Sequence, residues 1–369
     1  MRSLIALDVE GGQFFVDELS RAWERGDAVL PVDQRLPVEA KKLLFEELRP
    51  THFVTAQDRG SLADGIPVEE GDALVVATSG STGKPKGVIL THEAVLASAR
   101  AGSRALGVDS SDHWYACLPV SHIGGLSVVT KALLMGNGLS IAPRFEAHLA
   151  VEASHTCTLV SLVTTALQRI DPRLYRKILL GGSRPPTNRP PNVIATYGMT
   201  ETGSGIVYDS LPLEGVEISF SLDEEILIRS PMNMRGYRNH ESSIDADGWL
   251  HTGDIGRLSA EGTLVVDGRR GDVIVTGGEK VWPEPVETIL KPLFDRHDFA
   301  IVGLPDAEWG QRVVLATTKR DLTLSPVKDL ILDSLPNYFV PKEICFLDEI
   351  PRTSLGKIRR SEVVRRLNI

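Results

Sequence analysis

Short apolar runs alternate with amphipathic stretches and glycine-rich turns from about residue 72 to residue 265. The runs at 114–118, 177–180 and 193–196 have the length and composition of buried strands. Apolar residues recur on one side of a helix that is predicted to begin near Thr91. This alternation predicts an α/β fold built in layers, in which sites collect where loops leave the strand ends.

A domain boundary is predicted at the short, charged, glycine-containing segment 267–272. Beyond it the pattern becomes a compact α+β arrangement, with a helix that begins at Pro283. Strands are expected at 299–303 and 312–317, followed by a second helix around 326–335. The prediction is therefore a large α/β domain over residues 1–267 and a small α+β domain over residues 268–369.

Composition is ordinary for a globular protein, with 24% charged and 42% hydrophobic residues among 369. The net charge of −9 argues against a broad nucleic-acid surface. No apolar run approaches a membrane span, and the run at 4–7 is too short for a signal peptide, so a cytoplasmic location is expected. Three cysteines lie far apart, which indicates neither a zinc site nor a disulfide framework. A homodimer is compatible with the sequence because homodimers are common.

The segment 78–87 reads Thr-Ser-Gly-Ser-Thr-Gly-Lys-Pro-Lys-Gly. Four hydroxyls donate hydrogen bonds, three glycines let backbone N–H groups approach an anion, and two lysines add charge. The segment follows an apolar strand at 73–77 and precedes the predicted helix, which is the setting of a phosphate-binding loop. It is not a Walker A loop, because Thr78 stands where the first glycine is needed and Pro85 follows the lysine. The alternative is a flexible surface loop of small residues.

Three further segments carry candidate chemistry. Residues 197–203 place a carboxylate beside hydroxyls, which suits magnesium, although turns are also built this way. Residues 248–254 end in an aspartate that suits a ribose diol, or that caps its own turn. Residues 352–357 carry a lysine on a glycine-hinged loop, which is either a mobile charge for a site or an exposed lysine.

In their order and spacing across residues 72–369, these four segments resemble the adenylate-forming superfamily of acyl-CoA synthetases, peptide-synthetase adenylation domains and firefly-type luciferases. The resemblance implies a large α/β AMP-binding domain followed by a small mobile α+β domain. It implies that a carboxylic acid attacks ATP with Mg²⁺ present, releasing pyrophosphate and leaving an acyl-adenylate. The small domain then swings about a hinge, and the thiol of coenzyme A attacks the acyl carbon.

The resemblance also assigns roles to residues. Lys357 is implied to bridge the carboxylate and the α-phosphate, Thr200 to contact the α-phosphate, and Glu201 to bind magnesium. The other implied contacts are, for the β- and γ-phosphates, Thr78, Ser79, Gly80, Ser81, Thr82, Gly83, Lys84 and Lys86; for adenine, Gly181, Gly182, Ser183 and Tyr197; for ribose, Asp254 and Arg269; for the acyl substrate, Ser121, His122 and Gly198; and for coenzyme A, Gly277 and Gly278.

Within the superfamily the chain is similar to compact o-succinylbenzoate–CoA ligases, on the segments 197–209, 213–216, 277–279 and 310–313. Two features depart from the usual pattern: only 77 residues precede Thr78, and Gly271 stands at the hinge where many relatives carry Asp or Lys. The expected acid is o-succinylbenzoate. The alternatives are a ligase for other aryl or medium-chain acids, an enzyme that loads a carrier protein, and a nucleotide-binding protein without catalysis.

Overall fold

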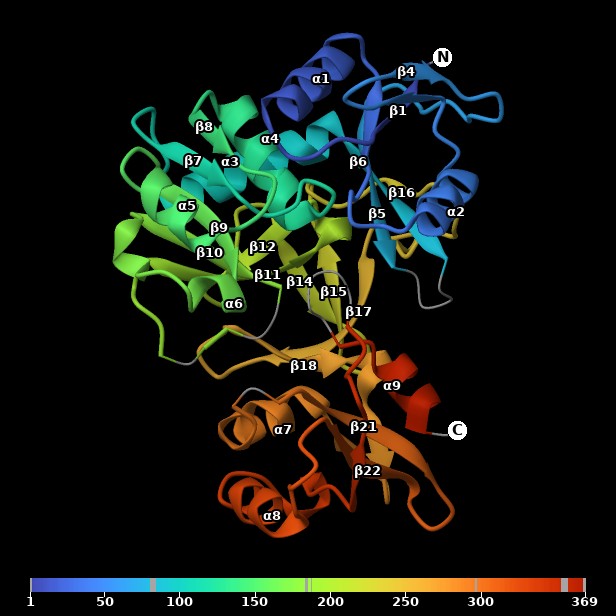
Figure 1. The fold of residues 1–369 in the computed structure, drawn as a ribbon, viewed down its shortest axis with the longest axis vertical. Helices are drawn as coiled ribbons and strands as arrows, with labels where there is room; N and C mark the ends of the chain where they lie inside the picture. The colour runs from blue at the N-terminus through green and yellow to red at the C-terminus, as the bar shows by residue number, and fades with distance from the viewer. Residues whose placement is uncertain are drawn as a thin grey trace. The chain divides into compact units, whose positions relative to one another are not determined.

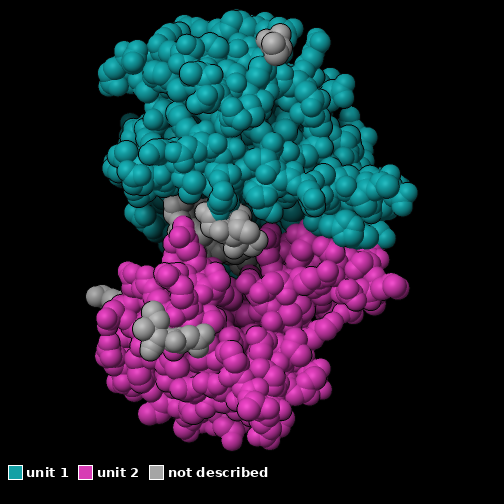
Figure 2. Space-filling model, turned by 90° about the vertical axis from the view of Figure 1, so that its right-hand side faces the viewer, with its two compact units in different colours: residues 1–219, 227–251 teal, residues 220–226, 252–369 magenta. Residues whose placement is uncertain are grey.

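The computed structural model describes residues 2–79, 84–182, 185–186, 188–295, 297–352 and 358–367. The chain forms two compact units, coloured in Figure 2. Unit 1 comprises residues 1–219 and 227–251, and unit 2 comprises residues 220–226 and 252–369. Both units mix helices and strands, which confirms the α/β fold class with a large first and a small second part (Figure 1). This division by compactness assigns residues 252–267 to the second unit. The predicted boundary at 267/268 separates the two functional domains instead, and it stays a prediction.

The first sheet of unit 1 has seven strands in the order β16-β6-β5-β2-β1-β3-β4. Its centre is parallel, because β1 pairs in parallel with β2 and β3, and β2 with β5, whereas β6, β16 and β4 are antiparallel to their neighbours. The strands are β1 (Leu4–Leu7), β2 (Ala28–Pro31), β3 (His52–Val54), β4 (Arg59–Ser61), β5 (Asp72–Ser79), β6 (Pro85–Thr91) and β16 (Gly236–Tyr237), with the helices α1 (Gln13–Glu24) and α2 (Val38–Leu48).

The second sheet of unit 1 has the order β13-β12-β11-β10-β9-β7-β8. Cys117 and Cys157 are buried in its core, as expected for small apolar residues. The strands are β7 (His113–Ala116), β8 (Gly138–Ile141), β9 (Leu159–Val163), β10 (Lys177–Gly181), β11 (Val193–Met199), β12 (Ser204–Tyr208) and β13 (Leu211–Pro212). The helical segments are α3 (His92–Leu106), α4 (Ile123–Met135), α5 (Ala147–Ala153), α6 (Thr164–Leu167), η1 (Pro172–Leu174) and η2 (Thr200–Thr202).

Helices α3 and α4 connect the two sheets of unit 1. Helix α3 contacts β5 and β6 of the first sheet and β12 of the second, whereas α4 packs on α3 and on β7, β9 and β12 (Figure 1). The predicted start of α3 is confirmed, because the Thr91 hydroxyl accepts a hydrogen bond of 3.1 Å from the backbone N–H of Ala94. These helices bring residues from both sheets into one region of unit 1.

The expected order of strand, glycine-rich loop and helix is incomplete, because it omits a strand. Strand β6 stands between the loop and α3, and it forms an antiparallel hairpin with β5 in which Thr78 faces Lys86. The physical reason is the apolar run 88–90, which is buried as the second strand of this hairpin. Thr78 and Lys86, which flank the centre of the predicted phosphate loop, therefore lie on a hairpin, and β6 separates them from the first turn of α3.

Unit 2 contains most of a sheet of order β14-β15-β17-β18, together with a five-stranded sheet in which β20, β19, β22 and β21 follow one another and β23 pairs with β22. The predicted helix at Pro283 is confirmed, and the second predicted helix covers 324–332. The strands are β14 (Glu217–Phe220), β15 (Glu225–Arg229), β17 (Leu250–Leu258), β18 (Leu264–Arg269), β19 (Ile274–Thr276), β20 (Glu279–Val281), β21 (Phe299–Asp306), β22 (Gly310–Thr317) and β23 (Glu343–Phe346). The helical segments are η3 (Arg270–Asp272), α7 (Pro283–Leu290), η4 (Lys291–Leu293), α8 (Leu324–Leu332), η5 (Asn337–Phe339) and α9 (Arg360–Leu367). In the described part of the chain, no helix is long and apolar enough to cross a membrane.

Replacing Arg360 by alanine is expected to destabilise unit 2 by about 3–5 kcal/mol, because it removes the guanidinium that pairs with the buried Glu287 carboxylate. The guanidinium Nη2 lies 2.8 and 2.7 Å from the two Glu287 oxygens, and both side chains are close to nine-tenths buried. Burial raises the pKa of Glu287 in spite of this arginine. Urea unfolding measures the loss, and Arg365→Ala on the exposed side of α9 is the matched control, with an expected change below about 0.5 kcal/mol. Equal changes in the two variants would contradict the prediction.

Candidate active site

The hairpin of β5 and β6 carries the first group of predicted phosphate ligands. Thr78 faces Lys86 across the hairpin, and Ser79 faces Pro85. The Lys84 ammonium lies 2.6 Å from a carboxylate oxygen of Glu47 on α2, and this hydrogen bond lowers the pKa of the Glu47 carboxyl. The ion pair is exposed and therefore weak, so it leaves Lys84 available for an anion of higher charge.

Glu201, the predicted magnesium ligand, lies at the meeting point of three segments that are far apart in the sequence. Its carboxylate accepts a hydrogen bond of 2.9 Å from the Tyr237 hydroxyl. Tyr237 lies on β16, which pairs with β6, and the Lys86 ammonium lies 5.1 Å from the centroid of its ring. The structure thus brings Lys86 and Glu201 together through Tyr237, a residue that the sequence analysis did not identify.

The donor set around Glu201 fits magnesium. Among the described residues, no three His, Cys, Asp or Glu side chains gather as a metal site. A single carboxylate is nevertheless what Mg²⁺ uses where substrate phosphates and water complete its coordination. Glu201 keeps acceptor capacity beyond the Tyr237 hydrogen bond, because an ionised carboxylate has about four lone-pair sites.

The turn that carries Thr200 and Glu201 is braced from within. The Thr202 hydroxyl oxygen accepts from the Met199 N–H at 2.9 Å, and its single O–H lies within hydrogen-bond distance of the backbone oxygens of Ser204 at 2.8 Å and of Met199 at 3.0 Å. The backbone oxygen of Glu201 accepts from the Met234 N–H at 2.7 Å. These hydrogen bonds fix η2, and with it the positions of Thr200 and Glu201.

The predicted adenine contacts lie at the carboxyl ends of two parallel strands, β10 and β11. Gly181 ends β10, Gly182 follows it with φ +85°, and Tyr197 lies half-buried on β11. A Cβ atom at Gly181 would lie 3.0 Å from the Thr196 hydroxyl, so glycine keeps this edge thin. The carboxyl edge of parallel strands is where ligands bind in α/β folds.

Two of the predicted acyl contacts, Ser121 and His122, lie just before α4, and His122 contacts the segment that follows β2. Ser121 is buried, and His122 precedes α4. The His122 Nε2 atom lies 3.3 Å from a carboxylate oxygen of Asp33 and 2.9 Å from Nη2 of Arg35. Hydrogen bonds from His122 and Arg35, with the charge of Arg35, hold the pKa of Asp33 far below its usual range despite its burial.

Gly198 is the third predicted acyl contact, and the structure gives it a steric reason. A Cβ atom there would lie 2.2 Å from the backbone oxygen of Ser204, at a point where the pairing of β11 and β12 is irregular. No side chain fits without moving the backbone, so the strand edge beside Tyr197 stays flat.

Unit 2 contains the predicted ribose and coenzyme A contacts. Asp254 on β17 and Arg269 on β18 face each other, and Arg269 Nε lies 2.9 Å from an Asp254 oxygen. The Asp254 side chain is 9% exposed, and the Arg269 guanidinium that pairs with it is about half exposed. Gly277 and Gly278, with φ +58° and +86°, form the two-residue turn of the β19–β20 hairpin, where glycine is favoured.

Several predicted residues lie outside the described part of the chain. These are Gly80, Ser81, Thr82 and Gly83 of the phosphate loop, Ser183 of the adenine segment and the catalytic candidate Lys357. Of Ser79 only the backbone is described. Their roles stay predictions.

Three residues near the site were missed in the sequence analysis: Tyr237, Asp33 and Arg35. Tyr237 follows Arg-Gly in a two-residue strand, which gives no periodic signal. The sequence shows Asp33 and Arg35 as an acidic and a basic residue two positions apart. No local pattern connects them with His122, which is 87 residues from Arg35.

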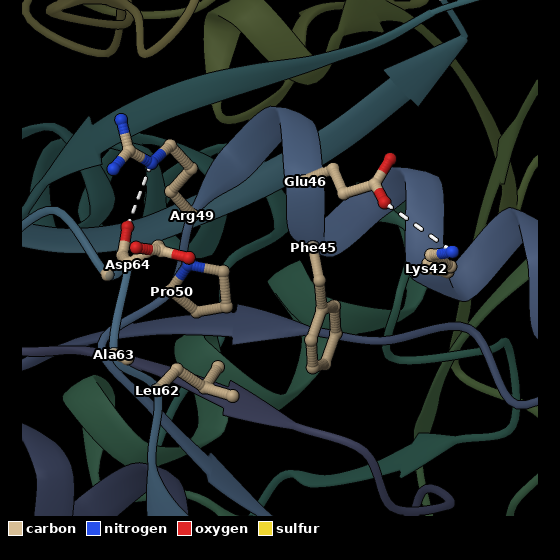
Figure 3. A pocket seen from close by; sticks show the side chains of 9 residues that line it. Lys42, Phe45, Glu46, Arg49, Pro50, Leu62, Ala63 and Asp64 are labelled. Atoms are coloured by element: carbon tan, nitrogen blue, oxygen red, sulfur yellow. Dashed lines mark hydrogen bonds and ion pairs between the residues drawn. The ribbon is translucent and has the colours of Figure 1, made fainter.

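A surface hollow of about 630 Å³ lies elsewhere in unit 1, against α2 (Figure 3). Arg49 lies at one side of it and donates to the backbone oxygen of Asp64 at 2.8 Å, and Lys42 lies near Glu46. Its lining is Lys42, Phe45, Glu46, Arg49, Pro50, Leu62, Ala63, Asp64 and Gly65. None of the predicted site residues lines this hollow, so it is a feature separate from the site.

Comparison with known proteins identifies the family of the chain. Residues 16–221 match the family described as AMP-binding enzyme, and residues 286–357 match the AMP-binding enzyme C-terminal domain. A 2-succinylbenzoate–CoA ligase of Bacillus cereus is 34% identical over 349 residues, covering 83% of this chain and 72% of the relative. One of Bacillus anthracis is 35% identical over 391 residues, covering 92% of this chain and 79% of the relative.

Solved structures give the same result for the whole fold. The o-succinylbenzoate CoA synthetase of Bacillus subtilis in complex with the acyl-adenylate intermediate OSB-AMP superposes with a TM-score of 0.87 and 26% identity, covering 98% of this chain and 88% of that one. The same synthetase in complex with ATP and magnesium ion gives a TM-score of 0.84 with 26% identity, covering 98% and 89%.

Proposed function

Because the chain belongs to the family of AMP-binding enzymes, and within it to the 2-succinylbenzoate–CoA ligases, we propose that it joins o-succinylbenzoate to coenzyme A. As a member of this family it is an adenylate-forming acid–thiol ligase. The observation that carries the proposal for the site is the convergence of Lys86, Tyr237 and Glu201 beside the phosphate hairpin. This convergence supports the proposal, because a nucleotide polyphosphate needs a cationic group beside it and its magnesium ion needs a carboxylate.

The first half-reaction forms an acyl–phosphate bond. A carboxylate oxygen of the acid attacks the α-phosphorus of ATP, the bond to the β-phosphate oxygen breaks, and pyrophosphate leaves. The acid is already ionised at neutral pH, so no strong base is needed. The protein must supply positive charge that offsets the repulsion between the carboxylate of the acid and the triphosphate of ATP. We assign this charge to Lys84, Lys86 and Lys357.

When bound, Mg²⁺ would neutralise phosphate charge beside Glu201. Thr200 would contact the α-phosphate, Gly181, Gly182 and Tyr197 would enclose adenine, and Asp254 with Arg269 would hold the ribose hydroxyls. The buried Asp254 carboxylate supports that role, since a carboxylate accepts both hydrogen bonds of a diol.

In the second half-reaction the thiol sulfur of coenzyme A attacks the acyl carbon, and AMP leaves with the electrons of the broken bond. Gly277 and Gly278 would line the path of the thin pantetheine chain, because their turn presents backbone without side chains. The domain boundary for this step is proposed at 267/268, next to Gly271, where a Cβ atom would meet nothing within 4 Å. The cytoplasmic location and the homodimer remain untested predictions.

The function is tested by pyrophosphate and acyl-CoA release with ATP, magnesium, coenzyme A and a panel of acids. Turnover confined to o-succinylbenzoate supports the proposal. Turnover with benzoate or medium-chain acids would instead identify a broader ligase, and acyl transfer only to a carrier protein would identify a different acceptor. No ATP–pyrophosphate exchange with any acid would mean that the chain binds nucleotide without catalysis.

Replacing Arg35 by methionine is expected to raise the KM for o-succinylbenzoate by about 10- to 100-fold, the effect of one charge-assisted hydrogen bond. The acid has a second carboxylate, and the Arg35 side chain, 44% exposed beside His122, offers it donors. The measurement compares the KM values of wild type and variant for o-succinylbenzoate and for 4-oxo-4-phenylbutanoate, which lacks that carboxylate. The KM for the second acid should change little.

The matched control is Arg173→Met, since Arg173 pairs with Asp171 in the same two-residue spacing on the surface. Its KM for both acids is expected to stay within about twofold. A loss for both acids in Arg35→Met would show that Arg35 acts on the fold of the pocket and not on the second carboxylate.

A further inference from the structure

Lys131 on α4 is a fully buried lysine that the proposed chemistry has not yet used. Its side chain is among the largest that are shielded from water, with 1% exposure. Burial, the sole cause acting on it, lowers the pKa of Lys131 to about 8. Among the described residues no carboxylate pairs with Lys131, and a buried ammonium in that setting is less stable than an apolar side chain of the same length. Such a residue calls for an explanation in function.

The surroundings of Lys131 are shaped to hold it. Its ammonium donates to the Ser204 hydroxyl at 3.2 Å, and that hydroxyl also lies 2.7 Å from the Ser98 hydroxyl on α3. A Cβ atom at Gly102 would lie 2.9 Å from Lys131 Cε and 3.0 Å from the Tyr208 hydroxyl. Glycine at position 102 therefore makes room for both buried polar side chains.

Ser204 connects this lysine to the site. It is the first residue of β12, directly after the turn that carries Thr200 and Glu201. Its backbone oxygen accepts the Thr202 hydroxyl at 2.8 Å and limits Gly198 to glycine. The ammonium is thus one hydrogen bond away from the turn where a phosphate group is proposed to bind. Because water is excluded around it, its charge acts at longer range than a surface charge would.

We propose that Lys131 is a positioning residue for the nucleotide phosphates, an inference that rests on the proposed function. Its buried ammonium holds Ser204, and with it the Thr200–Gly203 turn, and it makes that turn electropositive. The catalytic contacts remain those of the turn itself, and Lys131 acts through Ser204 without touching substrate.

The test is Lys131→Met, which keeps the length and removes the charge. Calorimetric titration with ATP is expected to show about tenfold weaker binding than wild type, equivalent to about 1.4 kcal/mol. Titration with adenosine, which has no phosphate, is expected to change less than twofold. The melting temperature is expected to stay the same or rise, because a buried charge has been replaced by an apolar group.

Two further variants make the result decisive. Thr130→Val alters the neighbouring buried position, whose hydroxyl donates to the backbone oxygen of Ser127 on the same helix, and should leave both affinities unchanged. Ser204→Ala keeps the charge and removes its acceptor, so ATP binding should weaken by about three- to fivefold. If Lys131→Met does not fold, Ser204→Ala decides the question by the same comparison of ATP with adenosine.

Equal losses for ATP and adenosine together with a lower melting temperature would reduce Lys131 to a structural residue and overturn the inference. Unchanged ATP binding in Lys131→Met and Ser204→Ala would overturn it as well, while leaving the proposed function intact. A wild-type chain that binds no ATP and exchanges no pyrophosphate would overturn both.

Discussion

Lys357→Ala is expected to lower the rate of acyl-adenylate formation by at least about 100-fold while leaving thioester formation from supplied acyl-adenylate largely intact. The first step brings an anionic carboxylate against a triphosphate, so a positive charge between them is needed in the transition state. The second step is an attack on a neutral acyl carbon, where that charge has little to stabilise. Pyrophosphate exchange measures the first half-reaction, and thioester release from synthetic acyl-adenylate measures the second.

The matched control is Lys328→Ala, because Lys328 is an exposed lysine on α8 of the same unit. Both half-reactions are expected to proceed in it at the wild-type rate. If the two half-reactions fell equally in Lys357→Ala, the role assigned to this lysine in adenylation would be wrong.

Glu201→Gln is expected to lower the rate of adenylate formation by about 10²- to 10³-fold, with a raised requirement for magnesium. The substitution keeps the size of the side chain and removes the charge that a hard cation needs. In the wild-type chain the Tyr237 hydroxyl lies 2.9 Å from the Glu201 carboxylate. Glutamine keeps an oxygen that can accept this hydrogen bond, so the turn should remain in place. The rate as a function of magnesium concentration is the measurement.

Tyr237→Phe tests the placement of the Glu201 carboxylate separately from its charge. The carboxylate keeps its charge and loses one hydrogen bond, so the expected loss is about 3- to 10-fold. Glu217→Gln, at an exposed glutamate paired with Arg229, should change nothing. Wild-type magnesium dependence in Glu201→Gln would place the cation on other residues.

Local chemistry in the sequence was enough to identify many elements. Thr91 is the cap of α3, and Pro283 is the first residue of α7, each for a reason contained in its own side chain. The apolar strand at 73–77 is part of β5. The sequence failed at the segment after the phosphate loop, since a buried strand of 85–91 and an entry into a helix look alike in a short apolar run.

What the sequence by itself determined was the type of chemistry and the elements that carry it, because hydroxyls, glycines and lysines in one segment favour phosphate binding through their own donors and charge. The tertiary structure decided which side chains support that site. Tyr237 reaches Glu201 across 36 positions, Arg35 reaches His122 across 87, and Lys131 reaches Ser204 across 73. Such contacts depend on the pairing of β16 with β6 and on the packing of α4 against β12. Pairing and packing are set by the burial of whole elements, and no local pattern in the chain records which polar groups they bring together.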